Sequence, residues 1–189
     1  MTAAVVTPYC HDLFQKVEDI HPSNEAFQSR NGEKLVKEIA RSIVKKHELE
    51  ATFGAILIHR HFDLQPDQRL VEFNNITMPW KSSHKRSDNE FLPTSWMLDT
   101  TTNKWMPYEF KFNPLGREQG IDLNEDKYAD FLHEYTMAVK TAGLEKAVGL
   151  RQFPGAGFVG GLEVTEGNAN VFLLPGEASQ PPIIHPILS

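Results

Sequence analysis

The 189-residue sequence has one cysteine, no long apolar run and no excess of basic residues. A single cysteine, Cys10, excludes a framework of internal disulfides and favours a reducing compartment. No stretch approaches the roughly 18 consecutive apolar residues of a membrane-spanning helix. The net charge of −6 disfavours non-specific binding to a phosphate backbone, which requires an excess of lysine and arginine. We therefore expect no nucleic acid and no membrane among its partners.

The sequence also lacks the short motifs of several common enzyme classes. It contains no Gly-x-Ser-x-Gly, P-loop, His-Glu-x-x-His, Cys-x-x-Cys or EF-hand loop. Residues 155–160 have the glycine spacing of a dinucleotide-binding turn, but a strand-like segment follows where that motif requires a helix. The N-terminal residues lack the basic and apolar regions of a signal peptide, so we expect a cytoplasmic location.

The apolar residues that are present predict a mixture of helices and strands. Spacings of three and four residues predict helices at 9–20 and 32–47 and a third helical region at 122–147 with a break at Gly143. Alternation of period two predicts strands at 52–62, 69–77, 94–99, 104–112, 148–153, 157–165 and 170–174. Short turns join most consecutive strands, so the predicted class is α+β. We expect a mainly antiparallel sheet of about six strands, packed by the N-terminal helices and one long late helix.

We expect one domain over residues 1–189, since 40% hydrophobic and 23% charged residues are ordinary for a globular protein. Its parts are a helical segment at 1–50, a β-rich segment at 51–112, the helix at 122–147, further strands at 148–174 and a proline-rich extended tail at 175–189. The polar segment 81–90 is expected to be an exposed connector, and a lid over a pocket is the alternative.

The most informative stretch is the run from Phe53 to Phe62, which ends in two histidines. Alternate residues of a strand share a face, so Leu57, His59 and His61 would lie in one row. A row that changes from apolar to imidazole side chains is typical of a pocket wall. We therefore treat this pair as the candidate centre of the site.

A carboxylate would join the histidines if the strands at 52–62 and 69–77 formed a hairpin. The simplest register places His59 opposite Glu72 and brings Asn74 close by. Such a set could bind a metal, or the carboxylate could orient an imidazole for acid/base chemistry. A shift of one residue would remove Glu72 from the set. Histidines with a purely structural role at a sheet edge are a third interpretation.

A His-x-His pair on a strand also resembles the metal sites of cupins. Those sites add a carboxylate shortly after the pair and a further histidine in a distal strand. Here no acid stands four or five residues after His61, and the segment 157–174 has no histidine. The metal interpretation therefore stays an alternative with His59, His61 and Glu72 as ligands, and no cofactor is predicted although a divalent metal is left open.

Aromatic residues gather in the middle strands and suggest a ligand cavity. We expect Trp96, Tyr108 and Phe110, with Leu57 and Asn74, to contact a bound molecule, and simple core packing is the alternative. In the same strand, residues 109 and 111 are expected to form an exposed charge pair.

One sequence pattern resembles proteins of known origin. Ile58–Phe62, followed by a turn, Val71, Glu72 and then Thr77–Trp80, is similar to a pattern in small proteins of filamentous fungi, over about a third of the chain. The resemblance implies a fungal origin and a role in secondary metabolism, and it supplies no catalytic residues.

Together these observations suggest a protein that binds a small, largely apolar or carbonyl-containing molecule. We expect an enzyme of acid/base chemistry, an isomerase, cyclase, lyase or hydrolase acting at an activated carbonyl. His59 would be the acid or base, Glu72 its orienting partner, and His61 a second donor. The alternatives are a non-catalytic binding or protein-interaction module and a metalloprotein, and a homodimer is left open.

Overall fold

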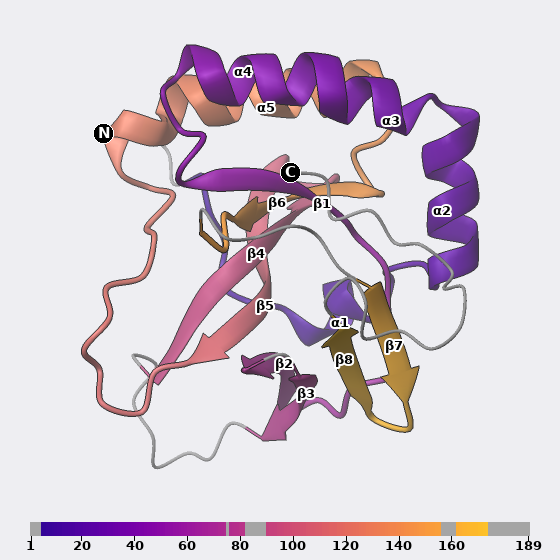
Figure 1. Ribbon diagram of the computed structural model, residues 1–189, viewed down its shortest axis with the longest axis vertical. Helices are drawn as coiled ribbons and strands as arrows, with labels where there is room; N and C mark the ends of the chain where they lie inside the picture. The colour runs from indigo at the N-terminus through magenta and orange to yellow at the C-terminus, as the bar shows by residue number, and fades with distance from the viewer. Residues whose placement is uncertain (1–4, 75, 82–89, 156–161, 174–189) are drawn as a thin grey trace.

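The computed structural model describes residues 5–74, 76–81, 90–155 and 162–173, and it has an α+β architecture. A curled sheet of eight strands has most of its helices packed against one side (Figure 1). The sheet is mixed, because β2 and β5 run parallel whereas all its other pairs are antiparallel. The expected class is confirmed, whereas the expected number of about six antiparallel strands is too low.

The helices lie in two parts of the chain. The N-terminal group comprises α1 (His11–Phe14), α2 (Ile20–Ser29), α3 (Gly32–Lys34), the π-helical turn η1 (Leu35–Ala40) and α4 (Arg41–Lys46). The later group comprises η3 (Asp126–Tyr128) and α5 (Ala129–Thr141). The prediction of one helix over 9–20 was wrong, since a new helix begins at Ile20. Pro22 lies in the first turn of that helix. Backbone amides there have no partner within the helix, so the missing amide hydrogen of proline breaks no hydrogen bond.

The strands follow the order β1-β6-β4-β5-β2-β3-β8-β7 across the sheet. Their bounds are β1 (Phe53–Leu57), β2 (Gln68–Phe73), β3 (Ile76–Lys81), β4 (Phe91–Asp99), β5 (Lys104–Phe112), β6 (Val148–Gln152), β7 (Leu162–Glu166) and β8 (Ala169–Leu173). The last two predicted strands, 157–165 and 170–174, correspond to a hairpin, because β7 pairs with β8 in antiparallel register. Three predicted features lie outside the described residues. They are the connector 81–90 without its two end residues, the glycine run after Gly155, and the proline-rich tail.

The main core lies between the helices and one face of the sheet. The apolar side chains of α5 are buried there, with Phe131, Tyr135 and Val139 each fully inaccessible to solvent. Phe53 on β1 stacks on Phe131, with ring centroids 5.3 Å apart. Smaller clusters fill the opposite face, where Phe14 stacks on Tyr108. Both faces of the central strands are therefore covered, which fixes their register.

The predicted hairpin between 52–62 and 69–77 is wrong. β1 ends at Leu57 and pairs with β6, whereas β2 pairs with β3 and β5. Gly149 on β6 allows this long-range pairing, because a Cβ there would meet both Ile58 Cδ1 and the Trp96 carbonyl oxygen at 2.5 Å. β1 therefore pairs with β6, which is almost one hundred residues away in sequence, and not with the nearby β2.

The segment after β1 leaves the sheet but stays tightly held. The Ile58 amide donates to the Ala147 carbonyl, and the Arg60 amide donates to the Glu18 carbonyl. The buried Tyr108 hydroxyl donates to the carbonyl of His59. These bonds fix the backbone of the histidine pair from both sides.

The curl of the sheet brings its two ends together. β1 and β7 are the terminal strands of the order, yet His61, just after β1, contacts Thr165 on β7 and Asn170 on β8. We call this junction the seam. Within the described part of the chain, no helix has the length and apolar character needed to span a bilayer.

Candidate functional site

Two histidines and one glutamate meet at the seam. The carboxylate Oε2 of Glu163 lies 3.8 Å from Nε2 of His59 and 3.6 Å from Nε2 of His61. The imidazole rings are 4.2 Å apart and nearly perpendicular. The side chains of both histidines are only 5% exposed, and that of Glu163 is 11% exposed. This set, His59, His61 and Glu163, is called the seam triad below.

The ring of His59 is oriented by the backbone. Its Nδ1 lies 3.0 Å from the carbonyl oxygen of Leu57. A carbonyl oxygen can only accept, so Nδ1 carries a proton, and Nε2 is the ring nitrogen that faces Glu163. Metal-binding histidines in proteins commonly donate their second nitrogen to a carbonyl in this way.

The ring of His61 is oriented by the β7–β8 hairpin. The Thr165 hydroxyl donates its hydrogen to Asn170 Oδ1 over 3.1 Å. Its oxygen Oγ1 is therefore placed to accept from His61 Nδ1 at 3.4 Å. The Asn170 amide lies 3.4 Å from His61 Nε2 and also donates to the Glu163 carboxylate. The contact to His61 is long for a hydrogen bond, so an ion at Nε2 could replace it at small cost.

The seam triad fits the dimensions of a metal centre. Its three ligand atoms all lie within 4.8 Å of one another. Two ligands each about 2.1 Å from a tetrahedral ion stand about 3.4 Å apart, and the two histidine–carboxylate distances exceed that by only a few tenths of an ångström. The two histidine–carboxylate distances of the triad are therefore close to those of two ligands on one ion.

Arg151 on β6 links the triad to two further carboxylates. Its guanidinium lies 3.4 Å from Glu72 and 3.7 Å from Glu109, and Ser95 donates to Glu109 over 3.0 Å. Burial raises the pKa of Glu72, Glu109 and Glu163 above the ordinary value of glutamate, and Arg151 offsets the rise only in part. Burial therefore disfavours the ionised form of all three carboxylates more than Arg151 favours it.

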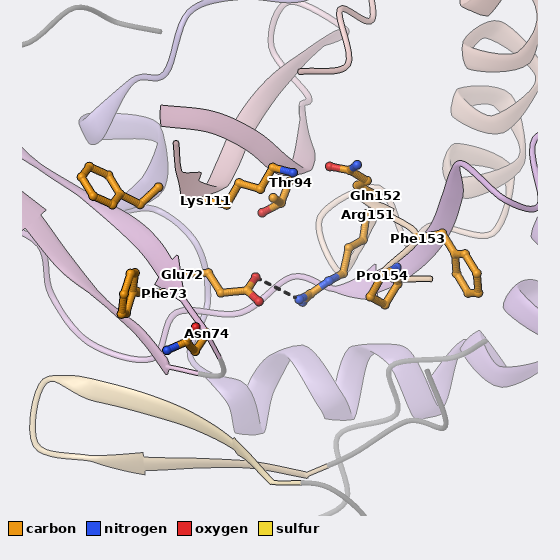
Figure 2. A pocket seen from close by; sticks show the side chains of 10 residues that line it. Glu72, Phe73, Asn74, Thr94, Lys111, Arg151, Gln152, Phe153 and Pro154 are labelled. Atoms are coloured by element: carbon orange, nitrogen blue, oxygen red, sulfur yellow. Dashed lines mark hydrogen bonds and ion pairs between the residues drawn. The ribbon is translucent and has the colours of Figure 1, made fainter. Parts of the chain in front are cut away.

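A cleft of about 390 Å³ opens beside this network. Figure 2 shows the Glu72–Arg151 ion pair within its lining. A smaller cavity of about 130 Å³ shares Glu72, Asn74 and Arg151 with the cleft and is also lined by Glu163. The two spaces are adjacent through these shared residues, and Glu163 of the seam triad lines the smaller one.

The structure brings together part of the predicted site. His59 and His61 converge as expected, but the carboxylate beside them is Glu163 and not Glu72. Glu72 lies across from Thr77 on β3 and pairs with Arg151, because β2 does not neighbour β1. It still lines both cavities, and so does Asn74, whose backbone φ is +56°. Leu57 contributes to the site through its backbone carbonyl oxygen, which lies beside Nδ1 of His59.

The three aromatic residues expected to contact a ligand do not come together. Trp96 is packed in the main core, Tyr108 in a second cluster with Phe14, and Phe110 in a third cluster with Val71. Each is at most 4% exposed. Their roles in the structure are those of core residues.

Sequence reasoning missed the residues of the hairpin. Glu163 and Thr165 alternate on β7, and Thr165 stands directly opposite Asn170 on β8. This polar row on one face of a short hairpin was the signal that could have indicated a site. The expectation that Glu109 is exposed was wrong, since it is 4% exposed and pairs with Arg151 instead of Lys111.

Comparison with known proteins adds no family to this geometry. The chain matches no family model, no curated protein and no solved structure. The fungal origin and the role in secondary metabolism therefore stay predictions from the sequence pattern alone.

Proposed function

We propose that this protein is a metal-dependent enzyme whose seam triad binds one divalent transition-metal ion. The observation that carries the proposal is the convergence of three buried ligand atoms within 4.8 Å of one another. Two imidazoles and one carboxylate suit Zn²⁺, Mn²⁺ or Fe²⁺. Three protein ligands leave further coordination positions for water or substrate, which is the arrangement of catalytic sites more than of structural ones.

The charges around Arg151 support a bound cation. Glu72, Glu109 and Glu163 all interact with Arg151, and Lys111 acts on Glu72 as well, so the fully ionised cluster has a net charge of −1. A divalent ion at the seam triad would offset this negative charge. Such an ion binds only the folded chain, because its ligands come from segments about one hundred residues apart in sequence.

The reaction class follows from what stands beside the triad. A metal ion supplies Lewis-acid polarisation of a substrate carbonyl oxygen. Glu72 lines the cleft and the smaller cavity. Its carboxylate could accept a proton from the carbon next to that carbonyl and return it to another atom of the substrate. Arg151 holds Glu72 in place through their ion pair. We therefore assign proton transfer next to a carbonyl, as in an isomerase, cyclase or lyase.

Metal content tests the proposal. The full chain is purified without a tag or chelator, loaded in turn with Zn²⁺, Mn²⁺ or Fe²⁺, desalted, and analysed by plasma mass spectrometry. We expect about one ion per chain for at least one metal. His61→Ala and Glu163→Gln should each lower the content at least about tenfold, as loss of a metal-site group does.

His47→Ala is the matched control, because His47 forms a histidine–carboxylate pair with Glu134 at 2.9 Å away from the seam. That variant should keep its metal. Equal metal content in wild type, Glu163→Gln and His47→Ala would contradict the proposal. It would leave the histidines with Glu163 as a metal-free acid/base pair, which exchange of α-protons of small ketones in D₂O, compared between wild type and His59→Ala, would detect.

A further inference from the structure

Thr94 is an unusual residue of the cleft wall. It is 7% exposed, and its buried hydroxyl has no hydrogen-bond partner among the described residues. A buried hydroxyl without a partner is costly, so such a group in a native protein requires an explanation. Rotation of the side chain would turn this hydroxyl from the wall into the cleft, where a bound ligand group would supply the missing partner.

The backbone explains why this hydroxyl lies at the cleft. β4 and β5 shift register between Pro93 and Ser95, which leaves Thr94 in a bulge. Bulges redirect a side chain that a regular strand would point elsewhere. The preceding Pro93 has no amide hydrogen to donate to the ladder, which favours an irregularity at this position.

Further donors stand next to Thr94. Lys111 pairs with Leu92 on β4, and Ser95 pairs with Arg151 on β6, which places Gln152 beside Thr94. Figure 2 shows Thr94, Lys111 and Gln152 on one side of the Glu72–Arg151 pair. The ammonium of Lys111 contacts Glu118, whose side chain is 58% exposed. Solvent screens the Glu118 end of this pair, so the ammonium of Lys111, whose side chain is 28% exposed, can also turn to a ligand.

The lining of the cleft favours a small anion with a flat apolar body. Its charged residues are Glu72, Lys111 and Arg151, with a net charge of +1 in a chain of net charge −6. Phenylalanine and proline side chains form its apolar part, at Phe73, Phe112, Phe153 and Pro154. Its volume of about 390 Å³ is within the range of small-molecule sites.

We propose that the cleft binds the carboxylate of a small aromatic acid, which Lys111 and Thr94 hold by an ion pair and a hydrogen bond. This anion site deepens the proposed function, because it would orient the remainder of the substrate toward the seam triad. Its role in catalysis rests on that proposed function. It names the substrate class as aromatic carboxylates that also carry a carbonyl group.

The test uses 4-fluorobenzoate and the neutral 4-fluorobenzamide as a matched pair. Their binding to the full chain, with and without Zn²⁺, is followed by fluorine NMR. We expect wild type to bind the carboxylate at least about tenfold more tightly than the amide, as a charge-assisted hydrogen bond predicts. Lys111→Met should abolish this preference, and Thr94→Val should weaken carboxylate binding about fivefold.

Lys127→Met is the control, since Lys127 is an ion-paired surface lysine like Lys111 but stands outside the cleft. It should keep the preference. Equal affinity of wild type for the two compounds, or a preference that survives in Lys111→Met, would overturn the anion site. If Thr94→Val does not fold, Lys111→Met alone decides. A preserved preference in a protein that binds no metal would overturn the proposed function and leave the anion site standing.

Discussion

Metal binding at the seam should stabilise the whole protein. The ligands of the seam triad come from the segment after β1 and from β7, which are the two ends of the sheet order. An ion that bonds to both would tie these ends together and would bind the folded state only. The perturbation is therefore the addition or removal of the ion, in wild type and in Glu163→Gln.

The size of the effect follows from mass action. At a free metal concentration one hundred times the dissociation constant, binding to the folded state adds about 2.7 kcal/mol to the free energy of unfolding. For a chain of this length each kcal/mol raises the melting temperature by about 2–4 °C. Wild type should therefore melt about 5–10 °C higher with the metal than with a chelator.

Differential scanning calorimetry checks this prediction. Wild type and His47→Ala should show the full shift, and it should grow with the logarithm of the metal concentration. Glu163→Gln should melt at the same temperature with metal and with chelator. A shift of the same size in Glu163→Gln would refute the reasoning, because the stabilising ion would then bind elsewhere.

Three further predictions concern the frame of the site. Gly149→Ala should lower the free energy of unfolding by about 1–3 kcal/mol in urea titrations, since its Cβ would overlap Ile58; unchanged stability would contradict the close packing of β6. Tyr108→Phe should cost about 1–3 kcal/mol by leaving the buried His59 carbonyl without its donor, and should weaken metal binding in isothermal titration; stability equal to wild type would count against that bond. The pKa of Glu109 is raised, so protonation stabilises the folded state and this contribution is lost as pH rises. Between neutral pH and the ordinary pKa of glutamate, acidification should stabilise wild type relative to Glu109→Gln. If the difference in free energy of unfolding between the two proteins does not change with pH, the raised pKa of Glu109 is contradicted.

Local patterns predicted the parts of this fold that local forces determine. The apolar stripe of α5 and the β7–β8 hairpin follow from spacings of three to four residues and of two residues, and both are present. The helix predicted over 32–47 is present as the continuous run α3, η1 and α4. The end of β1 was missed, because the histidine pair continues the alternation of the strand although its backbone bonds to Glu18 and Tyr108 instead of a neighbouring strand.

The site itself depended on long-range pairing. The pairing of β1 with β6 depends on Gly149, whose small size leaves room for Ile58, and no periodicity of the sequence shows that. The approach of Glu163 to His59 results from the curl of the entire sheet. The sequence therefore predicted the imidazoles of the site, whereas the identity of the carboxylate required the three-dimensional structure.

Anomalous X-ray diffraction from metal-loaded crystals tests the central claim most directly. Data collected on both sides of the absorption edge of the bound metal would locate the ion. The account predicts one peak within about 2.0–2.2 Å of Nε2 of His59, Nε2 of His61 and Oε2 of Glu163. Fully loaded crystals with their anomalous peak elsewhere, and none at the seam, would contradict it.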